Sequence, residues 1–101
     1  MTGRVAVAIP GDLDTPTGGY AYDRRVIDEL GALGWKVSHI PLGSSFPHPT
    51  AEDMSDAAQL LHSVPRDTPL VIDGLALGAL EPALVAEIAA PVVALIHHPL
   101  A

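Results

Sequence analysis

Short aliphatic runs alternate with helical patterns along this chain. Residues 4–9 form a β-branched run that Pro10-Gly11 closes, which predicts a strand. Residues 20–33 carry apolar side chains at three-to-four spacing, which predicts a helix, and Gly34 is a typical C-terminal stop. The predicted apolar face of this helix consists of Tyr22, Val26, Ile27, Leu30 and Leu33.

The alternation continues to the end of the sequence. Residues 36–42 predict a second strand, with Pro41 marking its end because proline cannot donate to a ladder. The spacing of Thr50 and Asp53 resembles a capping box, which predicts the start of a helix there. We expect this helix to run to about Ser63. Residues 70–73 predict a very short third strand. The last two elements are a helix that starts at Pro82 and ends before Pro91, and a fourth strand over residues 92–96.

Strands that alternate with helices predict an α/β fold with a mostly parallel sheet. Right-handed crossovers place helices on both faces, which gives a Rossmann-like three-layer α/β/α arrangement. We expect the strand order to be about 3-2-1-4, as in the first half of a Rossmann-like domain. The sequence stops shortly after a strand, so we interpret it as a partial lobe whose apolar faces meet more chain or a partner, self-association included.

Composition narrows the class of protein. The 101 residues are 49% hydrophobic and 17% charged, which excludes a disordered chain and suits one small domain. The net charge of -7, with only five Lys and Arg, argues against a nucleic-acid partner. There is no cysteine, and no stretch approaches the about 20 apolar residues of a membrane span. Without a signal-peptide pattern, we expect a cytoplasmic protein.

The strongest candidate for chemistry is the Gly18-Gly19 pair. It lies between the first strand and the first helix, after a loop rich in Gly, Pro and Thr. Glycine lets backbone N–H groups approach a phosphate, and the helix start adds free N–H groups and a positive dipole end. The alternative is a tight turn without a ligand. The spacing is not the G-x-G-x-x-G dinucleotide fingerprint.

Two further segments are expected at the same edge of the sheet, since ligands of open parallel sheets lie beyond the carboxyl ends of the strands. His97-His98 follows the fourth strand, and one imidazole could exchange a hydrogen bond with a substrate hydroxyl. A metal pair is disfavoured because adjacent strand residues diverge. Asp73 ends the third strand, where a capping role is favoured over a hydroxyl acceptor. Weaker candidates for lining the cleft are Tyr20, Ser44 and His48.

Four segments together resemble the N-terminal lobe of the group 1 glycosyltransferases, family 4 of the carbohydrate-active enzymes, which have the GT-B fold. Many enzymes of that fold share the Gly-Gly helix start, and its combination with the His-His-Pro-Leu run is more specific. The segments are Pro10-Gly11-Asp12, Thr17-Gly18-Gly19-Tyr20-Ala21-Tyr22-Asp23-Arg24-Arg25, Ile72-Asp73-Gly74-Leu75-Ala76 and Val93-Ala94-Leu95-Ile96-His97-His98-Pro99-Leu100.

The resemblance implies an enzyme of two Rossmann-like lobes that transfers a sugar with retention, usually without a metal or other cofactor. The N-terminal lobe would mainly hold a carbohydrate or lipid-linked acceptor, and the C-terminal lobe the nucleotide sugar. Gly18 and Gly19 would reach the donor phosphates, and His97 or His98 would contact the donor sugar near the reacting carbon. The resemblance also allows peripheral membrane association of the full-length protein.

The sequence departs from the family in lacking the C-terminal lobe with its paired glutamates. We therefore expect residues 1–101 to be a partial acceptor-side domain that is inactive alone. The alternative function is a stand-alone α/β module that binds a nucleotide or phosphate for regulation without catalysis. A dinucleotide oxidoreductase is disfavoured, because His39-Ile40-Pro41 stands where an acidic ribose ligand is needed.

Overall fold

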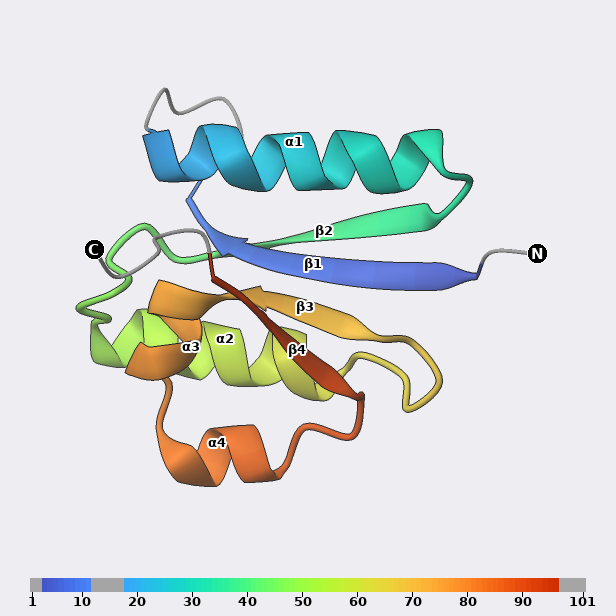
Figure 1. The fold of residues 1–101 in the computed structure, drawn as a ribbon. Coiled ribbons are helices and arrows are strands. Elements are labelled where there is room, and N and C mark those ends of the chain that lie inside the picture. Colours follow the sequence, from blue (N-terminus) through green and yellow to red (C-terminus); the bar gives the residue numbers. More distant parts are fainter. Residues whose placement is uncertain (1–2, 12–17, 97–101) are drawn as a thin grey trace.

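The computed structural model describes residues 3–11 and 18–96, with the backbone alone for residues 18–21. Strands and helices alternate as Figure 1 shows. In chain order the elements are β1 (Arg4–Pro10), α1 (Gly18–Ala32), β2 (Lys36–Leu42), α2 (Ala51–His62), β3 (Leu70–Asp73), α3 (Gly74–Ala79), α4 (Pro82–Ala86) and β4 (Val92–Leu95).

The four described strands form one parallel sheet with helices on both faces. Their order is β2-β1-β3-β4, and each neighbouring pair is parallel. Helix α1 covers one face, and α2, α3 and α4 cover the other (Figure 1). The predicted α/β class and parallel sheet are confirmed, and the arrangement is consistent with a Rossmann-like fold.

The predicted strand order, 3-2-1-4, is wrong, because β2 is an edge strand and β1 lies in the centre. Every residue of β1 after Arg4 is buried, whereas in β2 only Leu42 is buried and the other residues are exposed or half-buried. Pro41 lies within β2 and not at its end. A proline is tolerated there because the outer side of an edge strand needs no ladder hydrogen bond. The crossover from β2 passes β1 to reach β3, which places α2 on the face opposite α1.

The main core lies between the sheet and helices α2, α3 and α4. Leu61 of α2 and Leu70 and Ile72 of β3 are fully buried, so aliphatic packing fixes this half of the molecule. The buried members of this core are Ala6, Ala8, Leu42, Phe46, Ala57, Leu61, Val64, Leu70, Ile72, Ala76, Leu80, Leu84 and Ala90.

The predicted inward face of α1 is correct in its middle and wrong at both ends. Tyr22 and Leu33 are 42% and 69% exposed, respectively. The residue that turns inward is Asp23, which is fully buried. Asp23 lies three, four and seven positions before Val26, Ile27 and Leu30, so it shares their helical face.

Two short helices replace the single helix expected between β3 and β4. Helix α3 was not predicted, and α4 ends at Ala86, earlier than the expected stop at Pro91. Glycine and the small residues of α3 give no amphipathic repeat long enough to recognise in a helix of 6 residues. Asp73 caps that helix, and Pro82 occupies the first turn of α4 as expected.

Strand β4 is an apolar edge of the sheet. Val93 is 52% exposed and Ile96, just beyond the strand, is 69% exposed. Residues 88–96 carry no charge, although charged side chains are a common protection of sheet edges. In the part of the chain described, no helix is long and apolar enough to cross a membrane.

Candidate functional site

The carboxyl ends of β1 and β3 lie side by side at one edge of the sheet. The chain leaves β1 for α1 on one face and leaves β3 for α3 on the other. Such a divergence opens a crevice beyond the strand ends, and ligands of open α/β sheets bind there. The strand order therefore locates a candidate site at the carboxyl ends of β1 and β3, from which the chain leads to α1 and α3.

Gly11 makes the turn out of β1. Its φ of 71° is in the left-handed region that favours glycine, and its N–H donates to the carbonyl of Leu42 at 2.8 Å. This bond ties the start of the loop to the end of β2. Residues 12–17 lie outside the described residues.

Gly18 and Gly19 are the first two residues of α1. The first backbone N–H groups of an α-helix have no partner within the helix, and the dipole there favours an anion. The structure thus confirms a strand that ends at Pro10 and a helix start at this pair, but the two glycines lie inside α1 and not ahead of a helix that begins at residue 20. No phosphate contact follows from this geometry alone.

Asp73 serves as the cap of α3. One of its carboxylate oxygens, Oδ1, accepts hydrogen bonds from the N–H of Leu75 at 2.9 Å and of Ala76 at 3.2 Å. The residue is only 3% exposed. The favoured capping interpretation is confirmed, and the position remains at the candidate edge. The next residue, Gly74, packs closely against β4, since a Cβ on it would lie 3.0 Å from the Leu95 carbonyl oxygen.

The loop after β2 is built around a capping network. Thr50 Oγ1 accepts from the N–H of Asp53 at 3.1 Å, as a capping box requires. The Asp53 carboxylate accepts from the N–H and the hydroxyl of Ser45, and Ser45 Oγ accepts from the N–H of Thr50. In a capping box a glutamate side chain at the position of Asp53 accepts directly from the N–H of the cap residue, here Thr50. The shorter Asp53 side chain is joined to that N–H through the hydroxyl of Ser45 instead. Ser44 and His48 are exposed on this loop.

Several predicted site residues cannot be placed. His97 and His98 lie outside the described residues, as does the side chain of Tyr20. The structure places Asp73 beside the end of β4 and puts both at the same edge of the sheet as the end of β1, and it leaves the histidine contacts as predictions.

Asp23 is a candidate that sequence reasoning missed. Its carboxyl group is fully buried one helical turn after Gly19. Buried carboxylates are costly, so they often have a specific role in structure or function. The signal is present in the sequence, since Asp23 falls on the apolar stripe of α1, but the charged run Asp23-Arg24-Arg25 is also typical of a solvated helix face. In the described ranges, 3–11 and 18–96, no three His, Asp or Glu side chains gather to hold a metal ion.

Comparison with known proteins adds no assignment. No family model matches this chain, and no curated protein or solved structure matches it.

Proposed function

We propose that this chain is the acceptor-side lobe of a retaining glycosyltransferase that uses a nucleotide-sugar donor. The observation that supports the proposal most is the edge where β1 and β3 diverge. The chain runs from there to Gly18 and Gly19 at the start of α1. The resemblance described above assigns the donor phosphates to these glycines.

The chemistry at this edge follows from charge. As the glycosidic bond to the donor phosphate breaks, the nucleoside diphosphate gains negative charge. Backbone N–H groups held at a helix start stabilise that charge without reorganising. A second lobe would hold the nucleotide sugar, and this lobe would orient the acceptor hydroxyl toward the sugar carbon. In this proposal His97 or His98 contacts the donor sugar.

The transfer assay uses the native gene product with a panel of radiolabelled nucleotide sugars. The test variant is the double substitution Gly18→Ala with Gly19→Ala. Alanine strengthens the helix while its methyl groups keep a phosphate away, so a loss of activity is not helix melting. We expect at least about a tenfold loss of kcat/KM, the scale of one hydrogen bond to a charged group.

Gly31→Ala is the matched control in the same helix, since a Cβ there meets nothing within 4 Å. It should leave kcat/KM unchanged. A double variant as active as the wild type would overturn the role of the two glycines. A native gene product that ends at Ala101 and transfers no sugar would overturn the enzyme proposal.

The strand order also favours a second candidate, a stand-alone module that binds a nucleotide or phosphate for regulation. The order 2-1-3-4 recurs in small doubly wound proteins that bind a nucleotide at the divergence of the first and third strands. This module would saturate with a nucleoside diphosphate without a second lobe. Isothermal titration calorimetry on the native gene product separates the two candidates: the module gives saturable nucleotide binding without sugar transfer.

A further inference from the structure

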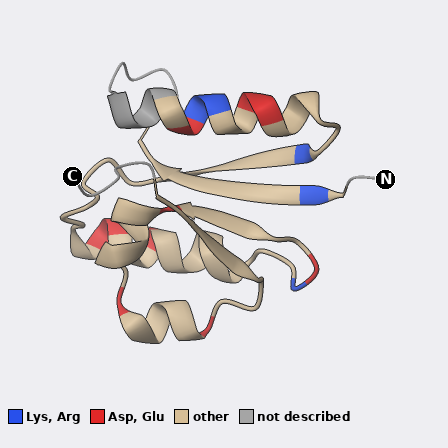
Figure 2. Cartoon of the chain, viewed as in Figure 1, with Lys and Arg blue, Asp and Glu red and all other residues tan. Residues whose placement is uncertain are grey.

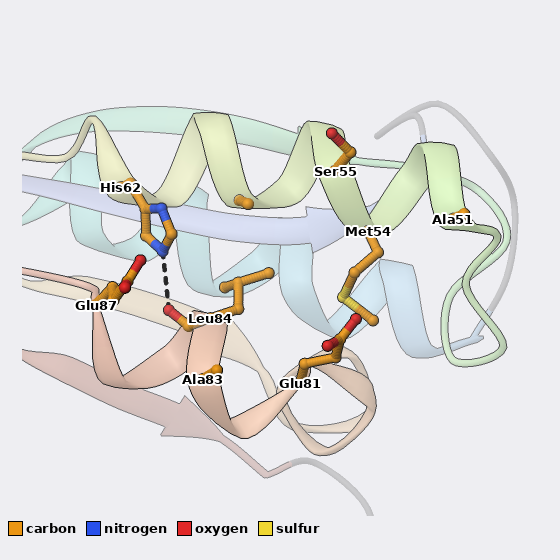
Figure 3. A pocket seen from close by; sticks show the side chains of 9 residues that line it. Ala51, Met54, Ser55, His62, Glu81, Ala83, Leu84 and Glu87 are labelled. Atoms are coloured by element: carbon orange, nitrogen blue, oxygen red, sulfur yellow. Dashed lines mark hydrogen bonds between the residues drawn. The ribbon is translucent and has the colours of Figure 1, made fainter.

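A groove separates α2 from α4 on the face of the sheet opposite α1 (Figure 3). Its volume is about 370 Å³, which lies within the range of small-molecule sites. The sheet separates it from α1, and it has no part in the proposed sugar transfer. Its lining residues are Ala51, Met54, Ser55, Ala58, His62, Glu81, Ala83, Leu84 and Glu87.

Apolar side chains line the middle of the groove, and a carboxylate lies toward each end. Met54, Ala58 and Leu84 are among its apolar lining residues. Glu81 immediately precedes α4 and Glu87 immediately follows it. Figure 3 shows the Glu87 carboxylate beside His62 and the Glu81 carboxylate beside Met54. The two negative charges therefore lie on either side of an aliphatic surface.

Among the described residues, neither carboxylate forms an ion pair. Glu81 occupies the N-cap position of α4 but makes no capping hydrogen bond with its side chain. Throughout residues 3–11 and 18–96, the ion pair found joins Arg25 to Glu29 on α1, and no cation lies within 4 Å of Glu81 or Glu87.

His62 holds the two walls together. Its Nε2 lies 2.9 Å from the carbonyl oxygen of Leu84 (Figure 3). A carbonyl has no proton to give, so Nε2–H is the donor. This bond joins the last turn of α2 to α4 and fixes the width of the groove at the end where Glu87 lies.

The charge of the surrounding surface also favours a cation. Glu52 and Asp56 are exposed on α2, next to the groove residues Ala51 and Ser55. Figure 2 shows basic residues on α1 and at the amino ends of β1 and β2, and one further basic residue, Arg66, lies in the turn between α2 and β3. A surface of one sign raises the local concentration of ligands of the opposite sign.

We propose that this groove binds an aliphatic diamine or polyamine. One ammonium group pairs with Glu81 and another with Glu87, while the methylene chain packs on Met54 and Leu84. A monoamine can pair with only one of the two carboxylates. A single metal ion does not suit two carboxylates held at opposite ends of an apolar surface.

The test is a ¹⁵N–¹H NMR titration of the native gene product with putrescine and spermidine. The matched probe is n-butylamine, which has the carbon chain of putrescine and one charge fewer. We expect saturable shifts of the α2 and α4 amides with putrescine and spermidine, and about two- to fivefold weaker binding of n-butylamine, since an exposed ion pair contributes up to about 1 kcal/mol.

The variants locate the charges. Glu81→Gln together with Glu87→Gln should weaken spermidine binding at least about fivefold, and Ala83→Trp should block the groove. Glu52→Gln removes the same charge from α2 outside the lining residues and should change the affinity less than about twofold. Circular dichroism confirms that each variant is folded.

Three results overturn the proposal. One is the absence of saturable shifts in α2 and α4. Another is that Glu52→Gln weakens spermidine binding as much as the double variant does, because the amine is then attracted by the overall negative charge of the surface and not by Glu81 and Glu87. The third is a lysine-rich peptide that binds this groove more tightly than spermidine, because the occupant is then a protein segment. None of these results bears on the glycine site, which the transfer assay tests separately.

Discussion

Replacing Asp73 by alanine tests how the candidate edge is held in place. The substitution removes the acceptor of two hydrogen bonds, at 2.9 Å to the N–H of Leu75 and 3.2 Å to the N–H of Ala76. Loss of an N-cap costs about 1–2 kcal/mol. Ala76 is fully buried, so its orphaned N–H adds part of the about 1–3 kcal/mol of an unsatisfied donor. We expect the free energy of unfolding to fall by about 2–3 kcal/mol.

The assay is equilibrium unfolding in urea, followed by circular dichroism. The midpoint should fall while the slope stays constant, because the surface exposed on unfolding is unchanged. Asp73→Asn is the matched control: it keeps a side-chain carbonyl oxygen at the position of Oδ1 and should cost less than about 1 kcal/mol. The reasoning fails if alanine costs under about 0.5 kcal/mol, or if asparagine costs as much as alanine.

Three further predictions concern the helices and the sheet edge. A Cβ at Gly31 of α1 meets no other atom, so Gly31→Ala should raise the free energy of unfolding by about 0.5–1 kcal/mol in the same urea assay. Gly34 has a φ of 98°, which alanine adopts only with strain, so Gly34→Ala should lower the free energy of unfolding by more than about 1 kcal/mol. Leu61→Ala leaves a cavity at a fully buried position and should lower the free energy of unfolding by about 2–5 kcal/mol. The control Leu60→Ala, at the exposed neighbouring position, should lower it by less than about 1 kcal/mol, and similar losses for the two variants would refute the core assignment. We expect the native gene product to self-associate through the exposed β4 edge, so Val93→Lys, which places a charge there, should reduce concentration-dependent association in sedimentation velocity. Absence of association in the wild type, or the same association in the variant, would contradict this role of the edge.

The sequence predicts the strands of this fold well because each is a short aliphatic run between turn residues. The first strand is buried on both faces, and its run of alternating valine and alanine shows this directly. Strand order is harder, since it depends on which strands find neighbours on both sides. The signal was nonetheless present in Pro41 and in the polar Lys36 and Ser38 of β2, which are typical of an edge strand.

The candidate site is predicted less completely. Capping by Asp73 follows from its place between a strand and a glycine, because a carboxylate there readily accepts from the N–H groups that follow. The burial of Asp23 could be found from its helical spacing but not from its chemistry, which favours solvent. The groove between α2 and α4 could not be predicted, because it depends on the tertiary approach of two helices that the His62 bond holds together.

The most direct test of the central claim is an NMR titration of the native gene product with inorganic pyrophosphate. A phosphate site at the start of α1 predicts saturable shifts of the Gly18 and Gly19 amides, retained in Gly31→Ala and absent from the amides of residues 18 and 19 in the double alanine variant. Shifts confined to other amides, or the same response in the double variant, would contradict a phosphate site at the start of α1.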